Sequence, residues 1–366
     1  MSRTILTLCF CALLAGGEPV PSSLALTLRG TVNSGAATTV STGLSLGGTV
    51  LAWSDLAVVA LPAQPATRMD SGLVTVVGEV LRGVPASLDK EAISFSCDLY
   101  GQLSVPLGQV AAVVLAPISL DQLANMLTGP SGAVLINGER VAGKLMFINA
   151  EAVGIDTGRR TAQVPRARVA TVVVTTAAPP GADAHVWFHT VSGDRLLARS
   201  VTVSLEGLAI TGPLGTATVT LVGLSGVTSS SSRVQALERA GSLRASATDR
   251  LGVALALPEV GFPGSYGGLS AQRGVVLPAR GEIAWRTAGA ANLVGWAVAP
   301  AFGVDAVARV VCDGKVSWEQ TLRPGAPATP FALPVQGVTE IVFRCDGVNG
   351  ALARCTVVWC HPTLVK

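Results

Sequence analysis

Histidines are the first residues of this chain whose type could support chemistry. His185 and His189 lie four residues apart in the run 184–189 (AHVWFH), so on a strand they would share one face and could bind a metal ion. The sequence places no third ligand beside them, and His361 stands alone near the end of the chain. We therefore predict no metal site and no cofactor, and we expect both strand histidines at the surface.

Carboxylates are the second candidates, because glycosidase chemistry needs two of them at a set separation inside a cleft. Those of the last third of the chain stand instead at predicted turns and strand ends: Glu282, Asp305, Asp313, Glu319 and Glu340. The sequence also lacks a G-x-S-x-G elbow and a phosphate-binding P-loop. We predict that the protein is not an enzyme.

Aromatic residues point to a different chemistry, which is sugar binding. A sugar ring stacks on an aromatic side chain and is edged by planar polar groups. Candidates of both kinds are Tyr266, Gln272, Arg273, Trp285, Trp296 and Trp318. Each tryptophan could instead fill a core, which we expect for Trp318 and Trp359. Tyr266 lies in a Gly- and Pro-rich loop and is expected to be exposed.

Composition limits the partners and the compartment. The 366 residues carry a net charge of +3 without a Lys/Arg block, so nucleic acid is not an expected partner. Residues 1–17 read as a signal peptide, with Arg3, an apolar stretch at 5–14 and small residues at 15–17. No later segment reads as a membrane span. We expect export to the periplasm, the cell surface or the medium.

Cysteines fit an exported protein, since four of the five that follow the signal lie within 312–366. Cys345 and Cys355 flank a Gly-containing turn, so a disulfide between them is one expectation and buried free thiols are the other. A zinc site is disfavoured, because the sequence has no C-x-x-C pair.

Internal repeats organise the first two thirds of the chain. The run 105–114 (VPLGQVAAVV) matches 164–173 (VPRARVATVV), with weaker copies at 53–61 and 219–228. Alternating short strands and Gly turns predict an all-β fold of small five-stranded, barrel-like repeats. We place the repeats at 25–66, 67–117, 131–178 and 184–230. A helix at 118–130 with a Ser119–Gln122 capping box bridges the second and third, and helical turns are expected over 234–240.

The C-terminal region, 243–366, predicts a separate β-sandwich. Eight short strands are expected, at 274–277, 281–287, 292–298, 306–312, 315–321, 329–334, 340–345 and 354–360. Asp313-Gly314 is a strong signal for a two-residue hairpin turn. Eight strands with such turns favour a jelly roll.

Two families resemble these regions. The runs 136–140 (INGER) and 164–173 make residues 25–230 similar to the tandem Sm-like barrels of secreted bacterial proteins. The ordered segments 267–277, 304–318, 323–330, 337–343 and 358–361 resemble the NPCBM family, which is named for carbohydrate binding. Gln272 or Arg273 stands where that family usually has a histidine, and 351–358 lacks its acidic residues.

The NPCBM resemblance implies a secreted, non-catalytic protein that binds a polysaccharide or glycoconjugate. The alternative is a structural component of the bacterial cell envelope that contacts envelope proteins and binds no glycan.

Overall fold

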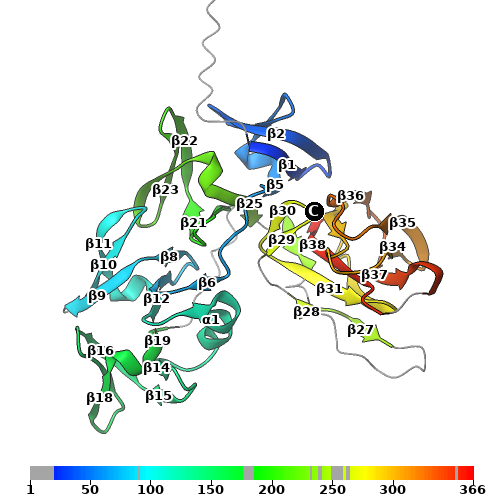
Figure 1. Ribbon diagram of the computed structural model, residues 1–366. Coiled ribbons are helices and arrows are strands. Elements are labelled where there is room, and N and C mark those ends of the chain that lie inside the picture. Colours follow the sequence, from blue (N-terminus) through cyan, green and yellow to red (C-terminus); the bar gives the residue numbers. More distant parts are fainter. Residues whose placement is uncertain are drawn as a thin grey trace, which may run out of the picture.

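The computed structural model describes residues 20–89, 91–175, 185–230, 233–237, 241–248, 259–260, 264–350 and 353–366 (Figure 1). The predicted signal peptide lies outside these residues. Almost all regular structure is antiparallel strand, because short runs of Val, Ala and Leu alternate with glycine and polar turns. Among the described residues no helix is long and apolar enough to cross a membrane.

Four repeat units make up the N-terminal two thirds, and each ends in a one-turn 3₁₀ helix and a buried strand. Unit 1 contains β1 (Val20–Thr27), β2 (Val32–Val40), β3 (Gly43–Leu46), β4 (Thr49–Ala52), η1 (Trp53–Asp55) and β5 (Leu56–Ala60). Unit 2 contains β7 (Gly72–Thr75), β8 (Val80–Arg82), β9 (Val84–Asp89), β10 (Ala92–Cys97), β11 (Gly101–Pro106), η2 (Leu107–Gln109) and β12 (Val110–Val114).

The other two units repeat this order. Unit 3 contains β14 (Gly132–Leu135), β15 (Arg140–Ala142), β16 (Lys144–Ile148), β17 (Ala152–Asp156), β18 (Thr161–Pro165), η3 (Arg166–Arg168) and β19 (Val169–Val173). Unit 4 contains β20 (His185–Thr190), β21 (Arg195–Ala198), β22 (Ser200–Ser204), β23 (Gly207–Gly212), β24 (Gly215–Val219), η4 (Leu221–Gly223) and β25 (Leu224–Ser230). The matching sequence runs therefore form the same corner, in which Pro106 and Pro165 immediately precede the 3₁₀ turn.

The final strands of the units pair with one another. β12 pairs with β19, where Val113 lies opposite Val172, and β25 pairs with β5, where Val227 lies opposite Val59. Units 2 and 4 meet through β8 and β21. The result is one 14-stranded sheet in which the units follow the order 3, 2, 4, 1.

No closed barrel is found among the described strands. In the described strands, the middle strands of units 2, 3 and 4 form separate three-stranded sheets, and no ladder closes a unit into a barrel. The reason is that each final strand uses one edge on the first strand of its own unit and the other edge on a neighbouring unit. No edge of a final strand remains for the strand that precedes the 3₁₀ helix of its own unit.

The predicted bridging helix is confirmed as α1 (Leu120–Leu127), which follows the short pair β6 (Arg68–Met69) and β13 (Ile118–Ser119). Ser119 and Gln122 form the expected capping box. The helical turns expected over 234–240 are wrong for 234–236, because β26 (Val234–Ala236) is a strand paired with the C-terminal strand. Leu237 has 3₁₀ conformation, and 238–240 lie outside the described residues. Pairing with a distant strand overrides the local helical pattern there.

The C-terminal sandwich confirms the eight predicted strands. They are β31 (Gly274–Pro278), β32 (Gly281–Arg286), β33 (Asn292–Val298), β34 (Ala306–Cys312), β35 (Lys315–Leu322), β36 (Thr329–Pro334), β37 (Glu340–Gly347) and β38 (Thr356–Val365). One sheet has the order β31-β38-β33-β36 and the other β32-β37-β34-β35, which is a jelly-roll order. β27 (Arg244–Ala247) and β28 (Glu259–Val260) extend the edges. Asp313-Gly314 forms the expected turn between β34 and β35, with positive φ at both residues.

Both faces of the β33 sheet are buried. Leu293 and Ala297 face the sandwich interior, whereas Trp296 and its neighbours on the outer face pack against β1 and β5 of unit 1. The hairpin of β29 (Gly264–Tyr266) and β30 (Leu269–Ala271) lies beside β5 and β25 at this junction (Figure 1). Its Ser270 backbone N–H donates to Leu61 O at 2.8 Å.

A buried carboxyl group lies where units 2 and 4 meet. Glu79, between β7 and β8, is fully buried, and its Oε1 accepts the Leu197 backbone N–H at 3.1 Å. Its Oε2 has no hydrogen-bond partner among the described residues. Burial, the largest cause, raises the pKa of Glu79 to about 7.

Gly143→Ala should destabilise the protein, because Gly143 lies where β15 bends into β16 and an added Cβ would lie 2.3 Å from Asp156 O. The matched control is Gly158→Ala, since Gly158 also has a positive φ but no atom within 4 Å of that Cβ. We expect urea unfolding to show an extra loss of about 1–3 kcal/mol for Gly143→Ala. Equal losses of unfolding free energy in the two variants would show that the contact with Asp156 O does not require glycine at position 143.

Glu79→Gln should change how stability depends on pH. The unfolded carboxyl loses its proton near its ordinary pKa of 4.5, before the folded one does, so the free energy of unfolding should fall as pH rises from about 4.5 to 7. The fall is up to about 3 kcal/mol. Glu79→Gln keeps the acceptor for Leu197, removes the charge and should abolish this slope in urea unfolding at pH 5 to 8. Exposed Glu139→Gln should retain it.

Candidate functional site

The predicted sugar-binding tryptophans are buried. Trp285 is 1% exposed in the sandwich interior, with its ring centroid 5.2 Å from that of Phe343. Trp296 is fully buried on the outer face, under unit 1, with its ring 5.0 Å from that of His361. Neither ring presents a face to a ligand in this conformation. Trp359 is buried and Trp318 is half-buried against Phe331, as expected for core residues.

The other three predicted residues follow one another around the β29–β30 hairpin. Tyr266 is half-buried against the junction with unit 1, rather than exposed as expected. Gln272 and Arg273 come directly after β30 and line a large cavity. The structure therefore brings two of the five predicted residues into one site and leaves the three aromatic residues outside it.

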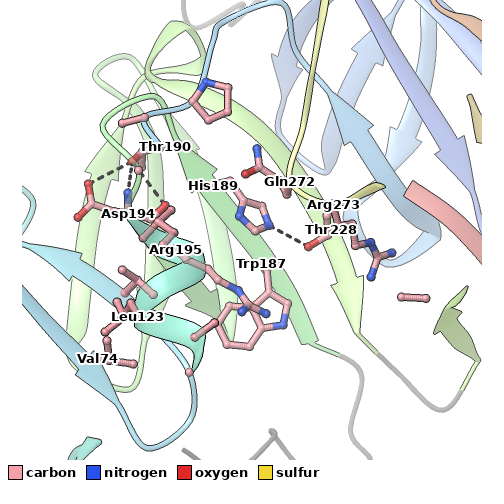
Figure 2. Close-up of a pocket in the computed structure, with 18 of the residues that line it drawn as sticks. Val74, Leu123, Trp187, His189, Thr190, Asp194, Arg195, Thr228, Gln272 and Arg273 are labelled. Atoms are coloured by element: carbon pink, nitrogen blue, oxygen red, sulfur yellow. Dashed lines mark hydrogen bonds between the residues drawn. The ribbon is translucent and has the colours of Figure 1, made fainter. Parts of the chain in front are cut away.

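This central cavity has a volume of about 620 Å³ and lies between unit 2, α1, unit 4 and the sandwich (Figure 2). Figure 2 shows Val74 and Leu123 on one side and Gln272 and Arg273 on the other. The lining comes from residues Pro65, Ala66, Val74, Gly78, Val80, Leu120, Leu123, Ala124, Leu127, Trp187, His189, Thr190, Gly193, Asp194, Arg195, Thr228, Ser229, Val234, Gln235, Ala236, Gln272 and Arg273. Its volume is in the range of small-molecule sites.

Strands β20 and β21 supply the polar wall of the central cavity. The Arg195 guanidinium lies 3.9 Å from the centroid of the Trp187 ring, in a cation–π contact. The indole N–H of Trp187 is buried and has no acceptor among the described residues. His189 Nε2 lies 2.9 Å from Thr228 Oγ1 on β25. His189 is 9% exposed, so the expectation that it lies at the surface is wrong: β25 and the sandwich cover this strand.

Asp194 is a structural group at the edge of the central cavity. Its Oδ1 accepts the Arg82 backbone N–H at 2.6 Å, and its Oδ2 accepts the hydroxyls of Ser192 at 2.6 Å and Thr190 at 3.1 Å. These bonds hold the turn between β20 and β21. Asp194 therefore fixes the wall on which Arg195 stands.

Arg273 is positioned by β38. Its Nη2 donates to Thr363 Oγ1 at 3.0 Å, and its Nε lies 3.2 Å from His361 Nδ1. His361 is buried, and burial, assisted by the nearby Arg273 charge, lowers its pKa well below the ordinary value. The neutral imidazole also receives the Gln272 backbone N–H at Nε2, 2.9 Å away. A neutral ring accepts at only one nitrogen, so the two donors compete for it.

A second hollow opens at one end of the sandwich. This end groove has a volume of about 390 Å³ and is lined by Val298, Ala299, Gln320, Thr321, Leu322, Arg323, Ala326, Pro327 and Thr329. Gln320 and Arg323 are exposed, as is Thr321. Phe302, three residues beyond the lining residue Ala299, is 91% exposed in the β33–β34 loop.

The sequence analysis missed several residues that line the two hollows and the exposed Phe302. Trp187 lies between His185 and His189 in β20, and Arg195 begins the next strand, β21. Phe302 stands between Pro300 and Gly303, a local signal for an aromatic residue in a loop. Gln320 and Arg323 carry no local signal, because only the fold places them beside Ala299.

Four of the five carboxylates considered for catalysis are engaged at the sandwich surface. Glu282 and Glu340 pair with Arg244, Glu319 pairs with Arg309 at 2.5 Å, and Asp313 accepts the Glu340 backbone N–H at 2.9 Å. Within the described parts of the chain, no group of three or more His, Cys, Asp or Glu side chains could hold a metal ion.

No family model matches this sequence, and no curated protein matches it. The chain is distantly similar in structure to CBM51 carbohydrate-binding modules. One is the CBM51 of Clostridium perfringens GH95 in complex with methyl-galactose, with 9% sequence identity and a TM-score of 0.28. The aligned region covers 36% of this chain and 99% of that chain. Another is the tandem CBM51 pair of Sp3GH98 from Streptococcus pneumoniae SP3-BS71, with 9% sequence identity and a TM-score of 0.29. That alignment covers 95% of this chain and 93% of the pair.

A third similar structure holds the CBM51-2 and INT domains of Clostridium perfringens ZmpB with GlcNAc, at 11% identity and a TM-score of 0.29. It covers 48% of this chain and 42% of that chain. These identities and scores are low for all three, so the sites above stand on their own geometry.

The cysteine pair expected to form a disulfide lies together in the sandwich. Cys345 and Cys355 are both free and buried, with their sulfurs 3.9 Å apart, whereas a disulfide bond is about 2.05 Å long. Their contact raises the pKa of Cys345 and lowers that of Cys355. Cys355 is therefore the sulfur that ionises first and attacks an oxidant.

Oxidised glutathione should join Cys345 to Cys355 with the loss of two hydrogens, detected by mass spectrometry of the non-reduced peptides. Closing this short loop should raise the free energy of unfolding by about 2–3 kcal/mol. Cys345→Ser should block both effects, whereas Cys97→Ser should block neither, because Cys97 lies in β10 of unit 2. A different pairing would disprove the expectation.

Proposed function

We propose that the chain is an exported, non-catalytic protein that binds carbohydrate at the end groove of its sandwich. One observation carries this proposal: Phe302, three residues after the groove residue Ala299, is an almost fully exposed aromatic residue, and Gln320 and Arg323 line that groove. A phenyl ring left in water at 91% exposure contributes nothing to the core, so its role is sought outside the fold.

The groove and the exposed Phe302 together have the two chemical features that a sugar needs. A pyranose has an apolar face of C–H groups, which packs on an aromatic ring such as Phe302. Its neighbouring hydroxyls donate and accept in pairs, which suits the amide of Gln320 and the guanidinium of Arg323. The hydroxyls of Thr321 and Thr329 line the same groove. The ligand we propose is a polysaccharide or glycoconjugate.

The remaining sequence expectations become part of this proposal. We place the sandwich in the NPCBM family and the repeat units among the Sm-like repeats of secreted bacterial proteins, on the segments that carry those resemblances. The signal-like residues 1–17 support export to the periplasm, cell surface or medium. The repeat units then serve as the support on which the sandwich is displayed.

The alternative is a structural or protein-interaction component of the cell envelope. It is favoured by the shared strand ladders between the units, which make a rigid support without needing a ligand. A glycan array probed with the full chain separates the two functions. Methyl-galactose and GlcNAc, the ligands of the distant CBM51 structures, are the first soluble probes.

Phe302→Ala should weaken glycan binding by about 5- to 10-fold, because the stacking surface is removed, while Phe302→Trp should retain it. Calorimetry with the array's best glycan gives the dissociation constants. Leu205→Ala is the matched control, since Leu205 is a 79% exposed apolar residue on unit 4. Undiminished glycan binding by Phe302→Ala would show that the glycan site does not include Phe302. A folded chain that binds no glycan would favour the structural alternative.

A further inference from the structure

We propose that the central cavity is a second ligand site, separate from the end groove, and that it binds a small carboxylate with an aliphatic body. The inference goes beyond glycan binding, since none of the end-groove residues lines this cavity. It depends on the two opposite walls of the cavity, on its excess of positive charge and on its unfilled hydrogen-bond donors.

The first wall is apolar and suits an aliphatic chain. Val74 and Val80 come from β7 and β8, and Leu123 and Leu127 from α1, which its capping box holds in place. Val74 and Leu123 are each 2% exposed, so these side chains form a fixed surface. A ligand of hydroxyl groups would lose its water against this wall without gaining hydrogen bonds. An aliphatic chain gains free energy there.

The opposite wall is cationic. Arg195 and Arg273 both line it, and Asp194 is the carboxylate among the described lining residues. Asp194 already accepts hydrogen bonds from Arg82, Thr190 and Ser192. The described lining therefore has two guanidinium groups against one carboxylate that is fully engaged, and this balance favours an anion.

Buried donors at this wall have no acceptor among the described residues. The Trp187 indole N–H is one, beneath the Arg195 guanidinium. Two further buried donors, Nε and Nη2 of Arg82, lie beside the lining residue Gly193, although Arg82 itself does not line the cavity. A buried donor without a partner costs free energy. A carboxylate has only hydrogen-bond acceptors, so it can accept from these donors better than an alcohol or a sugar hydroxyl, which also donates.

The site has an opening on the side of α1. Ala124 is an exposed residue of this helix and also lines the cavity, so the hollow reaches the surface there. The carboxylate would lie by Arg195 and the chain would extend along Leu123 (Figure 2). The lining residue Leu127, one turn further along α1, would continue this surface.

The test is calorimetric titration of the full chain with decanoate, decan-1-ol and glucuronate. We expect decanoate to bind saturably at one site, and the neutral alcohol of equal chain length to bind at least about tenfold more weakly. Glucuronate should not compete, because it lacks the aliphatic chain. Equal binding of acid and alcohol, binding of glucuronate alone, or no binding of decanoate would each overturn the proposal.

Two variants locate the site. Arg195→Gln should weaken decanoate binding by about tenfold or more, whereas Arg286→Gln, at an exposed arginine of the sandwich, should not. Ala124→Trp should block the opening from an exposed helix position, without disturbing the charged wall, and should abolish binding. Thermal unfolding shows that each variant is folded. Unchanged decanoate binding in folded Ala124→Trp would overturn the assignment to this cavity.

Measuring glycan binding in the same variants tests whether the central cavity and the end groove are separate sites. Phe302→Ala should leave decanoate binding unchanged, and Ala124→Trp should leave glycan binding unchanged. A loss of both activities in either variant would contradict two separate sites.

Discussion

A strand that is buried on both faces still has two edges whose N–H and C=O groups must find partners. This requirement governs the N-terminal two thirds of the molecule. β12 and β19 satisfy each other, and β25 and β5 do the same, with apolar side chains above and below. The units therefore depend on their neighbours for backbone hydrogen bonds. These ladders fix unit 3 against unit 2 and unit 1 against unit 4. The β8–β21 pairing joins units 2 and 4, which with α1 build most of the central cavity.

The junction between unit 1 and the sandwich gives the cavity its last wall. Apolar residues on the outer face of β33 and β38 pack on β1 and β5, and the β29–β30 hairpin is bonded to Leu61. Gln272 and Arg273 leave this hairpin toward unit 4, where Gln272 Nε2 donates to Ser225 Oγ at 3.0 Å. Polar residues of the sandwich thus reach a site that the repeat units otherwise form.

Local turn and cap chemistry made much of the fold readable in the sequence. Asp313-Gly314 has the conformation that a two-residue hairpin demands, and Ser119 with Gln122 caps α1 as their spacing predicts. Strand pairing could not be read in the same way. The strand at 234–236 exists because it pairs with the last residues of β38, more than a hundred positions away.

The site was less predictable because burial depends on distant neighbours. Trp296 is on the outer face of its sheet, where a sugar platform would lie, but unit 1 covers it. The central cavity joins Val74, Arg195 and Gln272, which belong to three separate parts of the chain. No periodicity or spacing connects such residues. Phe302 was within reach of sequence reasoning, since its loop is marked by Pro300 and Gly303.

The two-sided burial of β33 has a consequence for how this sandwich can be inherited or engineered. A jelly roll that is moved between proteins as a cassette needs a water-compatible exterior. Here Val294, Trp296 and Val298 would face water on any new host that lacks unit 1. Such a graft would self-associate through this patch. Recombination that keeps the sandwich functional must therefore carry the first repeat unit along with it, even though units 2, 3 and 4 lie between them in the sequence.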